Sequence, residues 1–192
     1  SAAALACMHP RDEAWRMGDA APKIRLSPEE YLAFERAAEE RHEYVAGEVV
    51  VMPPASFEHS GIAVGIVCEL RTALRDRRWA VFPCNMRVHI PATVGYVYPD
   101  ATVVCEPRLL QDDKRDNLLN PKVIVEVLSD SSEAYDRGDK FGQYRTITSL
   151  RTYVLASQKE PRIEVFARQP DDSWVLRVYG PGEHAALADP DV

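Results

Sequence analysis

Apolar side chains recur at helical spacing in three segments of the chain, and this pattern predicts three helices. The first follows Ser27, a residue type suited to the N-cap, and covers residues 28–41. The second is expected over about 59–77 and the third over about 133–146. The apolar residues that carry the first two patterns are Leu32, Phe34, Ala37, Ala38, Ile62, Ile66, Leu70 and Leu74.

Strands are predicted where polar and apolar residues alternate or where β-branched residues run together. Residues 43–52 alternate loosely and turn at Ala46-Gly47, which indicates a short hairpin. Val123 to Leu128 is a nearly unbroken apolar run with one charge, a pattern typical of a strand covered on both faces. Further strands are expected over 79–83, 86–90, 97–105, 151–156, 162–167 and 174–179, with a loop over 112–117. This order favours an α/β fold in which helices flank a sheet.

The length of 192 residues fits one compact domain. We expect that domain over residues 23–180, with flexible tails over 1–22 and 181–192, because both ends are rich in Ala, Pro, Gly and Asp without a sustained period. No apolar run approaches the ~20 residues of a membrane-spanning helix, and no signal peptide is evident, so no membrane association is expected. The four cysteines form no Cys-x-x-Cys pair, which favours reduced thiols and a cytoplasmic location.

The overall charge is acidic, with 23 Lys and Arg against 30 Asp and Glu and a net charge of −7. Such a balance argues against a general polyanion binder with a basic surface. Residues 1–22 hold two basic and three acidic side chains, and residues 181–192 hold three acidic ones, so the tails account for four of the seven net charges. The predicted domain itself is nearly balanced.

One stretch of the domain is basic, because only one acid, Asp76, accompanies five arginines between residues 71 and 90. Arginine suits bidentate contact with phosphate, so the stretch is a candidate nucleic-acid surface. The alternative is a solvated helix end whose cations complement the helix dipole. The five arginines are Arg71, Arg75, Arg77, Arg78 and Arg87.

Glu126 is the most informative single position, because it is the one charged residue of a strand predicted to be buried. A buried carboxylate is costly unless it is paired, protonated or bound to a metal. Its partner could be an arginine of the following helix. Asp100 offers another interpretation, because it follows Pro99 at the start of a strand-like run, Ala101 to Cys105. If the two strands are neighbours, two carboxylates converge, and a divalent cation would relieve their repulsion.

The third predicted helix carries a candidate cation for such a site. Asp136, Lys140 and Tyr144 are spaced i, i+4, i+8 and therefore share one face of the helix. A solvated Asp–Lys pair beside a packing tyrosine is the alternative.

Several short motifs occur in a fixed order along the chain. They are Ser27 to Leu32, Arg41 to Glu48, Met52 to His59, Tyr98-Pro99-Asp100, Val123 to Ser129, Asp136 to Lys140 with Tyr144, and Arg151 to Val154. In this order, over about residues 26–168, the chain resembles the Uma2 family of restriction-endonuclease-like proteins in the PD-(D/E)xK nuclease superfamily.

The resemblance implies an α/β restriction-endonuclease-like core: a mixed sheet flanked by helices, with the acids near one edge and an N-terminal helix and hairpin as additions. It implies that Asp100 and Glu126 are the two motif acids and that Glu43 completes an acidic cluster. The motif lysine would stand two residues after the strand acid, where this chain has Leu128. The family pattern places that lysine on the helix instead, as Lys140.

The chemistry implied by the resemblance is metal-assisted hydrolysis of phosphodiester bonds. Mg²⁺, with Mn²⁺ as a substitute, would be held by Asp100, Glu126, Glu43 and the backbone carbonyl of Val127, and would activate the attacking water. Lys140 would orient or deprotonate that water or stabilise the anionic oxygens. Residues expected near these groups are Ser129, Asp136, Tyr144 and His59, of which His59 is either a capping or core residue or a phosphate contact.

The sequence therefore predicts a Mg²⁺-dependent endonuclease that acts on double-stranded DNA in the cytoplasm, as a homodimer. One alternative is a catalytically silent protein of the same fold that binds or scaffolds, as Leu128 and the acidic charge suggest. Another is hydrolysis of RNA or a different phosphodiester at the same site. The acidic charge does not exclude a nuclease, since a bound divalent cation would neutralise the predicted cluster.

Overall fold

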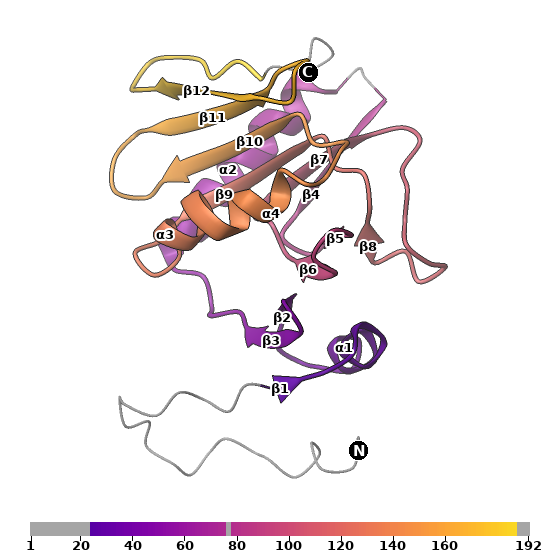
Figure 1. The fold of residues 1–192 in the computed structure, drawn as a ribbon. Helices are drawn as coiled ribbons and strands as arrows, with labels where there is room; N and C mark the ends of the chain where they lie inside the picture. The colour runs from indigo at the N-terminus through magenta and orange to yellow at the C-terminus, as the bar shows by residue number, and fades with distance from the viewer. Residues whose placement is uncertain (1–23, 76–77, 188–192) are drawn as a thin grey trace.

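The structure, a computed structural model, describes residues 24–75 and 78–187 (Figure 1). The predicted N-terminal tail, Arg77 and the last residues of the predicted C-terminal tail lie outside these ranges. The described part contains two six-stranded mixed sheets and a few helices. The predicted α/β class with a mixed sheet is therefore confirmed, and the structure adds a second sheet.

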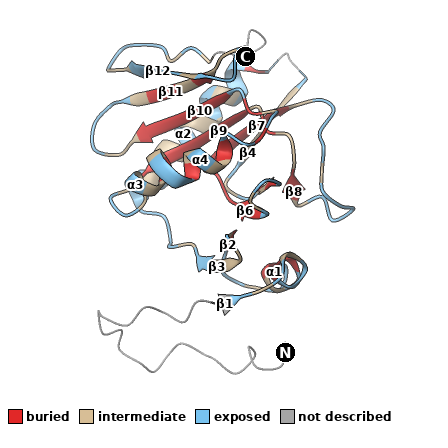
Figure 2. Ribbon diagram, in the orientation of Figure 1, coloured by how far each residue is buried: buried red, intermediate tan, exposed pale blue. Residues whose placement is uncertain are grey.

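The main sheet holds the strands that the apolar runs predicted. Its spatial order is β12 (Trp174–Tyr179), β11 (Ile163–Arg168), β10 (Thr152–Ser157), β9 (Val123–Leu128), β7 (Ala101–Cys105) and β4 (Trp79–Pro83). β9 and β10 run parallel, and the other neighbours are antiparallel. All six residues of β9 are buried, as their β-branched run predicted (Figure 2).

The second sheet contains the predicted N-terminal hairpin. Its order is β1 (Ile24–Arg25), β3 (Glu48–Val51), β2 (His42–Val45), β6 (Gly95–Val97), β5 (Arg87–Ile90) and β8 (Asn117–Leu118). β2 and β3 turn at Ala46 and Gly47, both with positive φ, which glycine adopts at no steric cost. The two-residue strands β1 and β8 are too short to leave a pattern in the sequence.

The single strand expected over residues 97–105 is wrong, because the chain changes sheets in its middle. β6 ends at Val97 in the second sheet and β7 starts at Ala101 in the main sheet. Pro99 lies between them and has no N–H to donate to a ladder, so strand pairing is interrupted there. The crossing segment, Tyr98 to Asp100, consequently joins the two sheets.

The first helix begins after its predicted cap, the second begins two residues before its expected start near residue 59, and both end early. α1 (Pro28–Glu35) has a capping box in which Ser27 Oγ accepts from the Glu30 amide at 3.2 Å and Glu30 Oε2 accepts from the Ser27 amide at 2.8 Å. It ends at Glu35 rather than near residue 41, because the Glu35 carboxylate binds the backbone N–H of His42 and turns the chain back. α2 (Phe57–Ala73) is capped by Ser56 and stops four residues before the predicted end.

The third predicted helix is a composite of three short pieces. These are α3 (Glu133–Tyr135), a π-helical turn (Asp136–Lys140) and α4 (Phe141–Tyr144). A π-turn widens the helix locally and occurs frequently at functional sites. Its two ends, Asp136 and Lys140, are both buried.

The helices cover the main sheet on opposite faces, as Figure 1 shows for α2 behind it and α4 in front. Val123 and Val125 of β9 pack on the α2 side with Val67 and Leu70, together with Ala185 and Leu187 from the chain after β12. The alternate residues of β9, Ile124 and Leu128, face Tyr144 and the second sheet. None of the helices in the described ranges combines the length and apolar character that a membrane crossing requires.

A charged network holds the outer end of the second sheet. Arg87 on β5 is only 3% exposed and is hydrogen-bonded to Asp116, which also accepts from Arg36 at 2.8 Å. The hydrogen bond from Arg36, reinforced by the charge of Arg87, lowers the pKa of Asp116. The network ties α1 to the segment before β8.

Asp116→Asn should therefore destabilise the fold by about 2 kcal/mol at pH 7, since it leaves the buried Arg87 without its counter-ion, a cost reduced by the partial exposure of Asp116. A carboxyl whose folded pKa is lowered contributes stability above its unfolded pKa and loses it as pH falls. The difference in free energy of unfolding between wild type and variant should thus disappear as the pH falls below about 4. Urea denaturation between pH 3 and 7 measures this, with exposed Asp113→Asn as the control. A pH-independent difference would contradict the role of the charge.

Candidate active site

Glu126 lies at the centre of the candidate site, on the face of β9 that α4 and the π-turn cover. It is 4% exposed, and its Oε1 accepts a hydrogen bond from the Tyr144 hydroxyl at 2.7 Å and lies 3.0 Å from the Lys140 ammonium. The arginine considered as an alternative partner is not the cation found there. Burial and pairing with Lys140 explain how the strand tolerates a charge.

Lys140 brings three carboxylates together. Besides Glu126, its Nζ lies 3.3 Å from Glu43 Oε1 and 3.7 Å from Asp136 Oδ1. Lys140 is 7% exposed, so the predicted alternative of a solvated Asp–Lys pair is wrong. The predicted shared face of Asp136, Lys140 and Tyr144 is present, although a π-turn produces it.

Asp100 stands beside this cluster and is held on both oxygens. Its Oδ2 accepts from the backbone N–H of Val127 at 2.7 Å, and its Oδ1 is 2.7 Å from Nε2 of His59 on α2. The predicted convergence of the two strands is correct, because β7 and β9 pair directly. They are interior strands, so the acids do not lie near a sheet edge as expected. Val127 meets Asp100 through its amide, where a carbonyl ligand was predicted.

Glu43 reaches the cluster from β2 of the second sheet. It is 8% exposed, and its Oε1 accepts a hydrogen bond from the backbone N–H of Tyr98 at 3.0 Å. Tyr98 belongs to the segment that crosses between the sheets. Glu43 and Asp100, 57 positions apart in the sequence, are therefore placed by the same short segment.

In the cluster, several buried acids surround one cation, Lys140, and this arrangement shifts their pKa values. Burial, helped by repulsion from Asp100, Asp136 and Glu43, raises the pKa of Glu126 to about 8 against the opposing effect of Lys140. Burial alone would lower the pKa of Lys140, but Glu126, Glu43 and Asp136 raise it above its ordinary value, so the ammonium stays charged.

His59 belongs to the edge of the cluster. The hydrogen bond with Asp100 raises its pKa, and its second ring nitrogen is 3.2 Å from Nε2 of Gln158. His59 is the third residue of α2, and its amide donates to the cap Ser56, so both its backbone and its ring have defined roles. His59 therefore both takes part in the cap of α2 and contacts Asp100.

Ser129 lies further out than predicted. Its hydroxyl bonds those of Ser131 and Ser132, and Ser132 in turn hydrogen-bonds the carboxylate of Asp136. Ser129 therefore acts on the cluster through Ser132. Gln158, Tyr98 and Glu35 were not anticipated, because no spacing rule links them to the acids.

The predicted metal site has suitable donor atoms in an unsuitable arrangement. Carboxylate oxygens are the ligands that Mg²⁺ prefers, so the donor type is suitable. Within residues 24–75 and 78–187, however, no three His, Cys, Asp or Glu side chains are arranged so that they could hold a metal ion. Three of the carboxylates converge on Lys140 instead. As arranged, the residues do not fit a metal.

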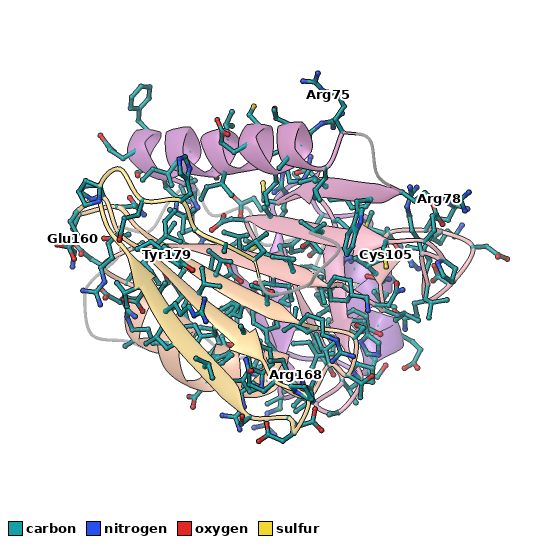
Figure 3. All side chains as sticks on the ribbon, turned by 90° about the horizontal axis from the view of Figure 1, so that it is seen from above. Arg75, Arg78, Cys105, Glu160, Arg168 and Tyr179 are labelled. Atoms are coloured by element: carbon teal, nitrogen blue, oxygen red, sulfur yellow. The ribbon has the colours of Figure 1, made fainter. Side chains whose placement is uncertain are left out.

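The predicted nucleic-acid contacts lie away from the acids. Arg71 on α2 stands twelve residues beyond His59, about 18 Å along the helix. Arg75, just after α2, and Arg78, just before β4, are exposed and project outward (Figure 3). Arg87 is wrong as a contact, because it is buried and paired with Asp116. Arg77 is outside the described residues.

Comparison with known proteins agrees with this fold. A crystal structure described as "a putative nuclease belonging to DUF820 from Anabaena variabilis ATCC 29413" superposes with a TM-score of 0.69 at 16% identity, over 86% of this chain and 90% of that one. The two chains therefore share one fold. The Uma2 family model, described as "Putative restriction endonuclease", matches residues 28–191. The chain belongs to the Uma2 family.

Two relatives come from Synechocystis sp. (strain ATCC 27184 / PCC 6803 / Kazusa). "Uncharacterized protein sll1609" is 34% identical over 151 residues, which cover 79% of this chain and 85% of the relative. "Uncharacterized protein slr1290" is 34% identical over 168 residues, which cover 87% of each. The family match over residues 28–191 includes the segments that carry the cluster.

Tyr144→Phe should lower the free energy of unfolding by about 1–3 kcal/mol, because it removes one hydrogen-bond partner of the buried Glu126 side chain. Tyr135→Phe is the matched control, since the Tyr135 hydroxyl is partly buried and accepts only a long 3.5 Å bond from Gln143. Chemical denaturation measures both variants. Equal losses of unfolding free energy in the two variants would show that the hydrogen bond from Tyr144 to Glu126 does not stabilise the fold.

Proposed function

We propose that this protein is a nuclease that hydrolyses phosphodiester bonds of DNA at the cluster of Glu43, Asp100, Glu126 and Lys140. The observation that carries the proposal is the convergence of these side chains from β2, the start of β7, β9 and the π-turn. A buried ion cluster assembled from four separate segments costs free energy to maintain. Its occurrence in a nuclease fold of the Uma2 family supports a catalytic use.

The roles proposed for the side chains follow from their charge. The ammonium of Lys140 would stabilise anionic phosphate oxygens as they enter the site. Asp100, linked to His59, would accept or orient the proton of an attacking water. Glu43 and Glu126 hold Lys140 in place from opposite sheets.

Mg²⁺ is the cofactor that we propose, with Mn²⁺ as its substitute. The number of carboxylates supports a divalent cation, whereas their present arrangement around Lys140 opposes one. We therefore propose that Lys140 and the metal compete for the same carboxylates.

Double-stranded DNA is the proposed substrate, with the exposed Arg71, Arg75 and Arg78 as contacts beyond the site and a homodimer as the active form. The thiols of Cys68, Cys84 and Cys105 are free, which supports the proposed cytoplasmic location.

The decisive experiment measures cleavage of duplex DNA, single-stranded DNA and RNA with Mg²⁺ or Mn²⁺. The wild type should cleave duplex DNA, and Asp100→Asn, Glu126→Gln and Lys140→Gln should each reduce the rate about 100-fold or more. Asp139→Asn, an exposed acid beside Lys140, should not. Cleavage that survives the first three substitutions would place the reaction elsewhere.

A catalytically silent binding protein is the second candidate function, favoured by the absence of a fitting metal arrangement among the described residues. Duplex binding that is equal in the wild type and the variants, without cleavage in either metal, would support this candidate.

Competition between Lys140 and a metal predicts that Lys140→Gln binds Mn²⁺ at least about tenfold more tightly than the wild type, because three carboxylates lose their internal counter-ion. Calorimetric titration measures the affinity, and Lys159→Gln, an exposed lysine paired with Asp130, is the control. Unchanged or weaker binding by Lys140→Gln would exclude the competition.

A further inference from the structure

The buried carboxylate of Glu35 lies outside the acidic cluster but contacts residues next to it. Glu35 is the last residue of α1 and is 7% exposed. Its Oε1 accepts from the Tyr98 hydroxyl at 2.8 Å, and its Oε2 is 3.0 Å from Nδ1 of His42. Both oxygens also receive the backbone N–H of His42, at 3.1 and 3.2 Å.

The two partners of Glu35 are next to the acids of the site. His42 directly precedes Glu43 in β2. Tyr98 donates its backbone N–H to Glu43 Oε1 at 3.0 Å and stands two residues before Asp100. One carboxylate therefore fixes both segments that present Glu43 and Asp100.

We propose that Glu35 is a positioning residue of the active site, which holds Glu43 and Asp100 through His42 and Tyr98. This inference rests on the proposed nuclease function. It makes α1, an addition to the nuclease core, part of the support of the catalytic groups.

The surroundings of Glu35 favour a precisely oriented hydrogen-bond acceptor over simple packing. The Tyr98 ring that it holds lies beneath two guanidinium groups, those of Arg41 and Arg87, at 5.9 and 5.8 Å from the ring centroid. The Tyr31 hydroxyl donates to the His42 carbonyl at 2.6 Å, so the backbone of His42 is held on both sides. An apolar residue could fill the same volume, but it could not accept these hydrogen bonds.

Glutamine at position 35 has the right shape but one acceptor oxygen, and its NH₂ group would face the donors of His42. The acids would shift while the fold remains. Misplacement of a catalytic group by about 1 Å costs up to 100-fold in rate. The effect should therefore appear in kcat.

The experiment compares Glu35→Gln, Glu35→Asp and Tyr98→Phe with Glu29→Gln, an exposed acid of the same helix. We expect kcat for duplex DNA to fall about tenfold or more in Glu35→Gln and Tyr98→Phe with KM unchanged. Glu35→Asp should recover part of the rate, and Glu29→Gln should match the wild type. A loss of activity that only follows the folded fraction, or a change in KM alone, would overturn the proposal.

A readout that does not need activity separates this proposal from the nuclease function itself. The amide of Tyr98, bonded to Glu43, should exchange its hydrogen about tenfold faster in Glu35→Gln than in Glu29→Gln. If the wild type cleaves no substrate but the exchange rate rises, the nuclease function fails while Glu35 still positions Glu43. Unchanged exchange at Tyr98 would show that Glu35 does not position these groups.

Discussion

The ion pairs between the buried Lys140 ammonium and three carboxylates are the interactions on which the rest of the site depends. Carboxylates from β2, β9 and the π-turn contact this ammonium, and like charges repel strongly in a poorly hydrated interior. Burial, with added repulsion from the neighbouring acids, raises the pKa of Glu126 to about 8. Without the cation, these acids would have to separate or take up protons. Lys140 thereby sets the ionisation of the cluster and also fixes the π-turn against β9.

The crossing of the chain between the sheets is the second constraint, and it acts through Tyr98 to Asp100. Because Pro99 cannot donate to a ladder, the chain leaves the second sheet and enters the main one within three residues. The Tyr98 amide binds Glu43, and Asp100 binds the Val127 amide, so each side of the crossing contacts the other sheet or a neighbouring strand. The same short segment therefore joins the two sheets and places two of the acids.

The sequence could predict those features of the fold and the site that depend on residues close together in the chain. The burial of Glu126, the hairpin at Ala46-Gly47 and the shared face of Lys140 and Tyr144 follow from strand alternation, turn chemistry and helical spacing. The Glu35–Tyr98 hydrogen bond joins residues 63 positions apart and leaves no periodic pattern. The burial of Arg87 was equally hidden, because its counter-ion Asp116 lies in a loop that only the folded chain brings near.

Leu128 stands where the resemblance predicts a lysine, and its surroundings explain why an apolar residue fits there. Leu128 shares a face of β9 with Glu126 and is 5% exposed, packed in the apolar cluster with Ile147 and Leu150. A lysine there would have to bury its charge among these side chains, which is costly without a partner. From the π-turn, Lys140 reaches the same Glu126 carboxylate while position 128 stays apolar. The π-turn therefore supplies a cation to Glu126 although position 128 is apolar.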